Sequence, residues 1–383
     1  MMKKLRKSKK MFSSILGFVA TVRYSFGCCF LITSPNMLLV VKSGHLIFLV
    51  SLFLTLGFQS CSNSSGVKSI ETPLFIYHSF ERADSIKVRD LFIDVWNWSV
   101  KDDKMIILSK QNRDYFLYVL SLPEFELIYK YGTYGRGPNE FVAVNWLNAL
   151  SDGQIGLYDI PQKKMYMYDL MTDTLILSKT FEFREWIENQ APPYTFIQQI
   201  EESLFVLKAD MKEHTEVEMV NIETGEVLQV FRPLLKRNRK TTTFAPYLFN
   251  ISASNDVIVF AYNFVNRLEL YNIRDKKVTP FLIIGSNKDQ ADKKIEDYVD
   301  YYTDVHCDNK YIYALSQCGF SSQNGNVKNS VIEIYTLDGV PFKEITIDRH
   351  IEFFTIDHKR NVIFGYDPNV DFDYVYVYNL CID

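Results

Sequence analysis

A short unit of strand and turn recurs six times along this chain. In its clearest copy, Val331 to Val340, an apolar strand carries only two polar residues and ends at the hairpin turn Asp338-Gly339. Every copy finishes with an apolar or aromatic residue, a small polar residue, and Leu or Ile, and successive copies are 43 to 64 residues apart. The six endings are Leu120-Ser121-Leu122, Tyr168-Asp169-Leu170, Val220-Asn221-Ile222, Tyr271-Asn272-Ile273, Tyr335-Thr336-Leu337 and Tyr378-Asn379-Leu380. A strand-rich unit of this length predicts an all-β, six-bladed β-propeller.

Composition agrees with a large β-sheet protein. The 383 residues are 47% apolar and 15% aromatic, which is enough to build a sizeable core. The 24 Tyr and 29 Phe favour strands. A formal charge of −4 is too small to attract nucleic acid or an acidic substrate over a distance, so we expect no nucleic-acid partner.

Four antiparallel strands are expected in each blade. The second strands are apolar on both faces, as befits strands enclosed by neighbouring blades. They are Met105 to Leu108, Ile155 to Tyr158, Leu204 to Leu207, Val257 to Phe260, Tyr311 to Leu315 and Val362 to Tyr366. Fourth strands follow in five units: Glu126 to Lys130, Thr174 to Phe181, Glu226 to Phe231, Lys277 to Ile284 and Phe342 to Ile347.

The sixth unit has no fourth strand, because the sequence ends soon after Leu380. An unpaired blade edge would invite aggregation. We therefore expect an N-terminal strand to close the ring. The apolar run Pro73 to Phe80 is the first choice, with Leu74 to Tyr77 pairing beside Tyr374 to Tyr378, and Ser85 to Val88 is the alternative.

The residues before the repeats read as an export signal. Met37 is followed by a weakly basic region and by the apolar core Leu46 to Leu56. Phe58-Gln59-Ser60-Cys61 resembles the bacterial lipobox, which implies cleavage before Cys61 and lipidation of its thiol. We interpret 1–36 as an upstream extension, 37–60 as the signal peptide, 61–72 as a tether and 73–383 as the propeller. The alternative is a retained membrane helix, but Leu46 to Ser60 is short for a span of about 20 residues.

The signal also predicts a location. Position 62 is Ser, not the Asp that retains some lipoproteins in the inner membrane, and no acidic run follows Cys61 to direct the chain to the cell surface. By default we expect an outer-membrane lipoprotein on the periplasmic face, with exposure at the cell surface as the alternative. In that oxidising compartment Cys307, Cys318 and Cys381 are expected to stay free, because the predicted strand holds the first two beyond the roughly 7 Å limit for a bridge.

Connection lengths divide the propeller into two faces. Turns between the first and second strands and between the third and fourth are short. The other connections, which share the opposite face, are long, and recognition residues lie on such loops. We call this side the long-loop face; it comprises Gly132 to Glu140, Arg184 to Tyr194, Arg232 to Phe244, Gly285 to Tyr301, Gly319 to Asn329 and Asp367 to Phe372.

One of these loops carries a family resemblance. The segment Tyr131 to Phe141, read as YGTYGRGPNEF, resembles the Gly-x-x-Gly-x-Gly-Pro-x-Glu-Phe segment of the TolB-like six-bladed propeller lipoproteins of Gram-negative bacteria. The resemblance implies the fold and an envelope location and does not imply a reaction. Arg136 and the nearby amides form a candidate anion site. The alternative is a tight crossover between blades, in which Glu140 caps exposed amides and Phe141 packs.

Candidate ligand-binding residues also lie on the predicted first strands, which line the channel. The acids are Asp94, Asp304 and Glu352, and the aromatic residues are Trp96, Trp146 and Tyr302. We find no nucleophile elbow, no zinc-like spacing and no cofactor motif, so no catalytic residue, metal or cofactor is assigned.

Two functions fit these features. The first is a lipid-anchored, monomeric propeller that binds an envelope protein, peptide or glycan through its long-loop face. The second is a propeller glycoside hydrolase or lyase, which would need two carboxylates about 5 to 9.5 Å apart at the channel mouth.

Overall fold

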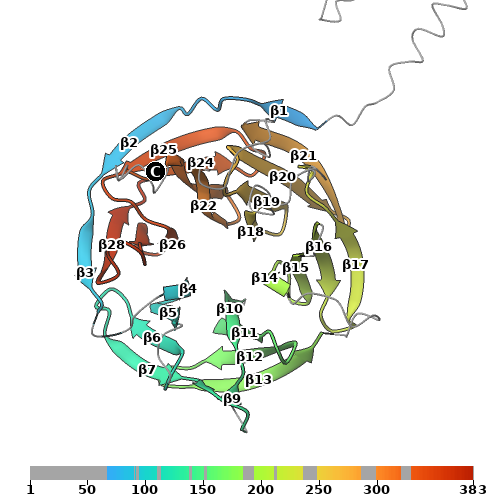
Figure 1. Ribbon diagram of the computed structural model, residues 1–383, viewed down its shortest axis with the longest axis vertical. Coiled ribbons are helices and arrows are strands. Elements are labelled where there is room, and N and C mark those ends of the chain that lie inside the picture. The colour runs from blue at the N-terminus through green and yellow to red at the C-terminus, as the bar shows by residue number, and fades with distance from the viewer. Residues whose placement is uncertain are drawn as a thin grey trace, which may run out of the picture. The chain divides into compact units, whose positions relative to one another are not determined.

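Six sheets are arranged in a ring around a central axis (Figure 1). The computed structural model describes residues 67–89, 91, 95–109, 114–137, 140–150, 153–183, 194–210, 214–235, 248–285, 299–320 and 329–382. None of these segments forms a helix long and apolar enough to cross a membrane. The predicted six-bladed β-propeller is confirmed.

Each blade is built from four antiparallel strands that follow one another outward from the axis. Blade 1 contains β4 (Val95–Lys101), β5 (Lys104–Ser109), β6 (Leu117–Ser121) and β7 (Leu127–Tyr131). Blade 2 contains β10 (Val144–Ala149), β11 (Gln154–Asp159), β12 (Lys164–Leu170) and β13 (Leu175–Glu182). Blade 3 contains β14 (Tyr194–Gln199), β15 (Leu204–Asp210), β16 (Thr215–Asn221) and β17 (Glu226–Phe231).

The remaining blades follow the same plan. Blade 4 contains β18 (Phe249–Ala253), β19 (Val257–Tyr262), β20 (Arg267–Arg274) and β21 (Lys277–Gly285). Blade 5 contains β22 (Asp300–Cys307), β23 (Tyr311–Phe320), β24 (Val331–Thr336) and β25 (Pro341–Ile347). Blade 6 contains β26 (Phe353–Asp357), β27 (Val362–Tyr366), β28 (Tyr374–Asn379) and, from the N-terminal segment, β3 (Asp84–Lys87).

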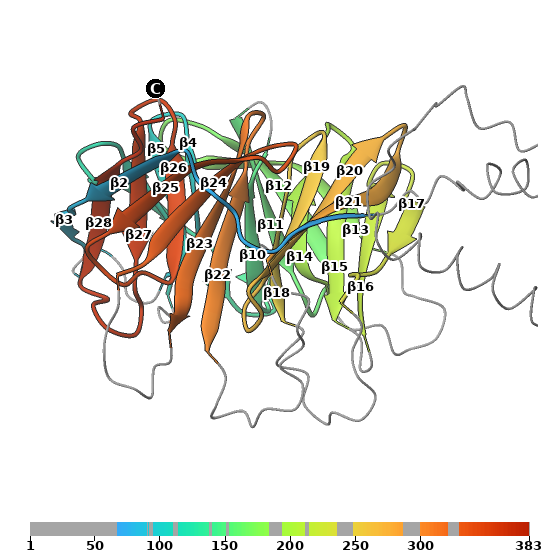
Figure 2. The same cartoon turned by 90° about the horizontal axis from the view of Figure 1, so that it is seen from above.

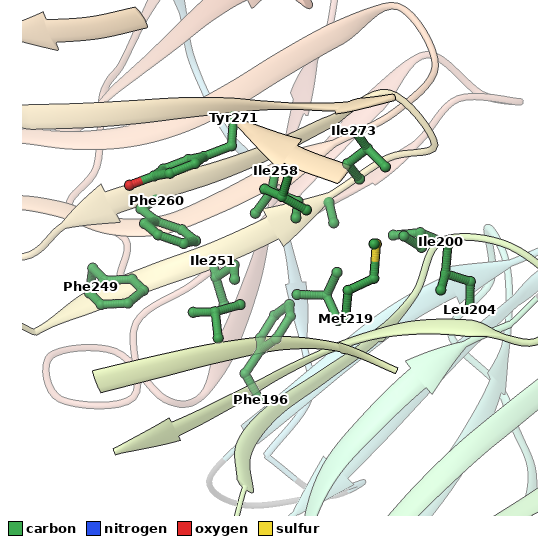
Figure 3. Close-up of a cluster of buried hydrophobic side chains, with 14 of the residues drawn as sticks. Phe196, Ile200, Leu204, Met219, Phe249, Ile251, Ile258, Phe260, Tyr271 and Ile273 are labelled. Carbon is green, nitrogen blue, oxygen red and sulfur yellow. The ribbon is translucent and has the colours of Figure 1, made fainter. Parts of the chain in front are cut away.

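The core consists of six hydrophobic clusters, one at each interface between neighbouring blades. Figure 3 shows the cluster between blades 3 and 4, where Phe196 and Met219 face Ile251 and Phe260. Second strands lie in the middle of this packing; all six residues of β19 are buried. A fully buried Leu, Ile or Phe side chain contributes about 1.5–3 kcal/mol. Blade-to-blade burial is therefore the main stabilising term.

The recurring Leu or Ile has a defined place in this packing. In every copy it lies within one residue of the end of the third strand and contacts the cluster shared with the preceding blade. The amide of Leu122 donates to the carbonyl of Asp103, and that of Ile273 donates to Asp256, each in the first turn of its own blade. The repeat thus marks a residue that closes its own blade and seals it against the previous one.

An N-terminal strand closes the ring, as expected, but the strand is not the one we placed first. Val375 of β28 pairs with Ile86 of β3, and Tyr374 pairs with Lys87. Leu74 to Tyr77 do not pair with blade 6, so the first choice is wrong and the alternative, near Ser85, is correct. Ile86 packs into the cluster between blades 6 and 1, whereas Leu74 and Ile76 are 84% and 67% exposed.

The segment that precedes β3 follows the outer wall of the ring. β1 (Lys68–Ile70) adds a parallel strand to β21 in blade 4, and β2 (Tyr77–Glu81) adds one to β25 in blade 5. We call residues 68–87 the N-terminal belt; Figures 1 and 2 show it passing across the outer edges of three blades. β1 falls within the stretch that the sequence assigns to the tether.

Candidate functional site

Several predicted long loops lie outside the described residues, including 184–193, 236–247, 286–298 and 321–328. The described parts of the long-loop face are the glycine-rich segment, the connection between β27 and β28, and the residues around the starts of β22 and β26. The channel opens among these elements, because the first strands begin on this face.

The central channel contains a cavity of about 350 Å³. The first strands of all six blades line it, and Figure 1 shows these strands around the centre of the ring. Its walls are aromatic and amide-rich. The aromatic residues are Trp96, Trp98, Phe196, Phe249, Phe353 and Phe354, and the amides are Asn97, Gln198, Gln199 and Asn250.

Polar side chains in the channel join the first strands of blades 3, 4, 5 and 6 to one another. The Gln198 amide donates to the carbonyl of Ala253 at 2.7 Å and accepts from its N–H at 2.9 Å, which links blades 3 and 4. Asn250 donates to Thr303 O at 2.6 Å, which links blades 4 and 5. These contacts satisfy the side chains and fix the width of the channel.

Asp304 makes the corresponding link between blades 5 and 6. Its carboxylate accepts the N–H of Phe354 at 3.0 Å and that of Val305 at 2.8 Å, and lies 3.3 Å from Nε2 of His306. The same nitrogen of His306 is 2.7 Å from the carbonyl oxygen of Phe354. Burial would lower the pKa of His306, but Asp304 and this carbonyl outweigh it, and the pKa is raised. Asp304 therefore holds two blades together.

Of the other residues predicted to line the channel, Trp96 does so, and the side chains of two more are not described. Trp96 lines the cavity and is 39% exposed; it occupies an irregularity in the β4–β5 register between Val95 and Asn97. Trp146 lies on the first strand β10, but its side chain is outside the described part of the structure. Asp94 is also outside the described residues.

Tyr302 does not line the channel. It is 1% exposed, and its hydroxyl group donates to Oε2 of Glu333 at 3.0 Å, within the cluster between blades 4 and 5. The cause is register: β22 shifts against β23 both before and after Tyr302, so the alternation that the sequence predicts is interrupted. The channel-facing prediction for Tyr302 is wrong.

Glu352 lies one residue before β26 and is not among the residues that line the channel cavity, so the channel-facing prediction for Glu352 is wrong. It belongs to a group of titratable side chains on the long-loop face, which sequence reasoning did not assemble. It accepts the amide of Asn369 at 2.5 Å, and Asp367 lies 2.8 Å from Nδ1 of His350. Burial raises the pKa of Glu352 and that of Asp300. Burial would lower the pKa of His350, but Asp367 reverses this effect and the pKa is raised. The sequence signal was the acid-rich loop after β27.

That loop also exposes apolar surface. Oδ1 of Asp367 accepts the N–H groups of Asn369 and Val370 at 2.8 and 3.0 Å, which shapes the turn. Val370 and Phe372 are 63% and 40% exposed. A carboxylate group next to exposed apolar side chains forms a mixed surface suited to recognition.

The glycine-rich loop has the geometry of the predicted crossover. Oε2 of Glu140 accepts the N–H of Gly137 at 2.6 Å, and Phe141 is 2% exposed. A Cβ at Gly135 would lie 1.9 Å from this Oε2 atom, so a larger residue there would displace the Glu140 carboxylate from the Gly137 amide. Pro138 lies outside the described residues. Arg136 is exposed and lines a pocket of about 360 Å³ together with Glu140 and Tyr166.

The three described cysteines, Cys307, Cys318 and Cys381, form no disulfide with one another. Burial raises the pKa of Cys307 to about 12, which keeps its thiol protonated and unreactive. Among the described residues, no three His, Cys, Asp or Glu side chains are placed to hold a metal ion.

Glu218 provides a pH-dependent prediction away from the channel. Burial raises its pKa from 4.5 to about 6, although Tyr194 donates to Oε2 at 2.9 Å and lowers it. Because the folded chain binds this proton more tightly than the unfolded chain does, stability falls as the pH rises from 4.5 to 6, by about 2 kcal/mol. Glu218→Gln should therefore raise the free energy of unfolding by about 1–2 kcal/mol at pH 8 and change it little at pH 4. Urea unfolding at both pH values checks this; an equal gain at both would contradict it.

Comparison with known proteins agrees with the architecture. A family model described as TolB-like 6-blade propeller-like matches residues 77–359. A search of curated proteins gave no match. A Bacteroides fragilis protein described as exported has 11% sequence identity and a TM-score of 0.50, over 82% of this chain and 99% of that protein. A DUF4221-family member from Bacteroides vulgatus has 12% identity and a TM-score of 0.52, over 78% of this chain and 95% of that one. The chain belongs to the TolB-like six-bladed β-propeller family.

Proposed function

We propose that this protein is a lipid-anchored binding module of the cell envelope, which engages a protein, peptide or glycan through its long-loop face around the channel mouth. The observation that carries the proposal is that polar side chains in the channel form hydrogen bonds between blades. Gln198, Asn250 and Asp304 are occupied in joining neighbouring blades. A rigid ring that presents a mixed loop surface is a scaffold for recognition.

The catalytic alternative has less support. Hydrolysis of a glycosidic bond needs two carboxylates about 5 to 9.5 Å apart. Among the described residues that line the cavity, Asp304 is the one carboxylate, and three neighbouring groups occupy it. Aromatic side chains such as Trp96 and Phe353 can stack on a bound sugar or peptide without any reaction.

The proposed location in the cell envelope is supported by the N-terminal residues and by one protein of the same fold. Cys61 follows a segment that resembles a lipobox, and the Bacteroides fragilis protein with the same fold is described as exported. We place the chain in the outer membrane on its periplasmic face, attached through lipid on Cys61.

Site-specific photo-crosslinking tests the recognition face. A photoreactive phenylalanine analogue at Phe372, on the long-loop face, should give discrete adducts with an envelope component in living cells. Met171 provides the matched control, because it is 43% exposed, against 40% for Phe372, and lies in a short turn on the opposite face.

The expected result is an adduct yield at least about tenfold higher from position 372 than from position 171, with gel mobility and mass spectrometry as readouts. Equal yields, or adducts from position 171 alone, would assign recognition to another surface. Hydrolysis of a polysaccharide by the purified protein would favour the catalytic alternative.

A further inference from the structure

We propose that the N-terminal belt is a membrane-docking surface, on which Leu74, Ile76 and Phe80 insert into the interfacial region of the lipid bilayer. The nearness of the bilayer rests on the proposed lipidation of Cys61. The surface itself is a property of the described fold.

The belt turns large apolar side chains outward. Leu74, Ile76 and Phe80 are 84%, 67% and 54% exposed, and the first two are the most exposed large apolar side chains in the described chain. Intervening residues face the propeller instead: the ring of Phe75 lies 5.3 Å from that of Tyr335, and Tyr77 lies 5.5 Å from Phe342. Tyr77 keeps 54% of its surface exposed, so it can contribute at the edge of the patch.

This alternation predicts a partner other than the propeller. Residues that only needed to cover blade 5 would place their apolar side chains inward and polar ones outward. Here Leu74, Ile76 and Phe80 make the outward side largely apolar as well, with His78, which lies 3.3 Å from Glu344, as the polar residue between them. No protein in the described chain covers these three apolar side chains. Contiguous exposed apolar side chains mark interaction surfaces in soluble domains.

The length of chain before the belt selects the bilayer as the partner. Six residues separate Cys61 from Lys68, the first residue of β1, and the seven steps from Cα to Cα span at most about 25 Å when fully extended. A lipid on Cys61 would therefore hold the belt close to the headgroups, at a high effective concentration. Aliphatic and aromatic side chains partition into this interface.

The charged residues near the exposed apolar side chains predict whether docking requires anionic lipid. Lys68, Glu71, Glu81 and Arg82 place both signs close to the apolar side chains. Attraction to anionic lipid therefore contributes little, and docking should occur on neutral bilayers and survive high salt. Attachment through the outer wall of blades 4 and 5 leaves the long-loop face open to partners.

Crosslinking in lipid tests the surface directly. The lipidated chain is reconstituted in phosphatidylcholine vesicles with a photoreactive phenylalanine analogue at Ile76, Phe80 or Ile176. Ile176 is the matched control, because it is 49% exposed and lies on the outermost strand of blade 2, away from the belt. Phospholipid adducts should form from positions 76 and 80 at a yield at least about tenfold above position 176. No adduct from 76 or 80, or equal yields from all three, would overturn the proposal.

A second measurement separates this proposal from the lipid anchor. Cys61→Ser should move most of the chain from cell membranes into the soluble fraction, because the belt alone binds more weakly than the anchored chain does; if it does not change fractionation, the proposed anchor fails, and the belt does not fail with it. The Cys61→Ser chain is then sedimented with phosphatidylcholine vesicles. Binding that falls about tenfold with Ile76→Asp and does not change with Ile176→Asp supports the belt. Binding that is absent, or insensitive to Ile76→Asp, counts against it.

Discussion

Replacing Ile86 with Asp is expected to lower the free energy of unfolding by about 2–4 kcal/mol. Ile86 pairs with Val375 of β28 and packs in the cluster between blades 6 and 1. Ile86 is partly buried, so the substitution removes the apolar surface that it packs against the cluster and places a carboxylate next to apolar neighbours. It also weakens the only N-terminal strand that completes blade 6, and a partly open ring loses packing on both sides of the closure.

Ile76→Asp is the matched control, since it makes the same change 10 residues earlier on the same belt. Ile76 is 67% exposed, so the free energy of unfolding should stay within about 0.5 kcal/mol of the parent. Urea unfolding followed by tryptophan fluorescence measures both. Similar losses of unfolding free energy for the two variants would mean that the pairing and packing of β3 do not stabilise the closed ring.

The sequence predicts the ring well because the same packing problem recurs six times. Each copy must pack one blade against the previous one, so the terminal residue of each repeat, such as Leu122 or Leu380, is apolar in all six copies. The observed bounds follow from this periodicity; β17, Glu226–Phe231, matches the expected fourth strand. Local patterning is a reliable guide where each unit meets the same environment.

Ring closure was harder to predict because hydrophobicity alone pointed to the wrong segment. Pro73 to Phe80 is more apolar than Asp84 to Lys87, yet the second stretch completes blade 6. Chain connectivity explains the choice: β3 ends shortly before β4, so a short connection carries the chain from the outer edge of blade 6 to the axis of blade 1. The apolar residues that this leaves outside are the ones that we assign to the membrane.

The candidate site was predictable in outline and not in its side chains. Position in the repeat correctly placed Trp96 and Asp304 in the channel. The prediction failed at Tyr302 because β22 has register shifts on each side of that residue, and a shift of one residue reverses the direction of a side chain. The group around Glu352 brings together residues from two blades and a loop, and no spacing in the sequence encodes that proximity.

Replacing Glu269 with Ala is expected to destabilise the fold by about 3–5 kcal/mol, the largest effect among our substitutions. Glu269 is fully buried, and its carboxylate accepts Nε of Arg267 at 2.7 Å and the hydroxyl group of Tyr271 at 2.6 Å. It also accepts the N–H groups of Leu234 and Leu235 at 2.8 and 3.0 Å. Alanine would leave the buried Arg267 guanidinium and the Leu235 amide without this carboxylate, while the Leu234 amide would keep the Tyr271 hydroxyl group at 3.1 Å.

The same residue connects stability to the recognition face. Leu234 and Leu235 lie near the start of the long connection between blades 3 and 4. Their hydrogen bonds to Glu269 therefore hold the N-terminal end of a loop on the long-loop face. Glu269→Gln keeps an acceptor oxygen but loses the charge, and its loss in unfolding free energy should be smaller than that of Glu269→Ala. Hydrogen exchange at Leu234 and Leu235 should accelerate in both variants, and more in Glu269→Ala, because the amides lose a charged acceptor in both. If Glu269→Ala costs less than about 1 kcal/mol, or leaves exchange at these amides unchanged, the carboxylate does not hold the loop, and blade-to-blade packing alone would have to fix its position.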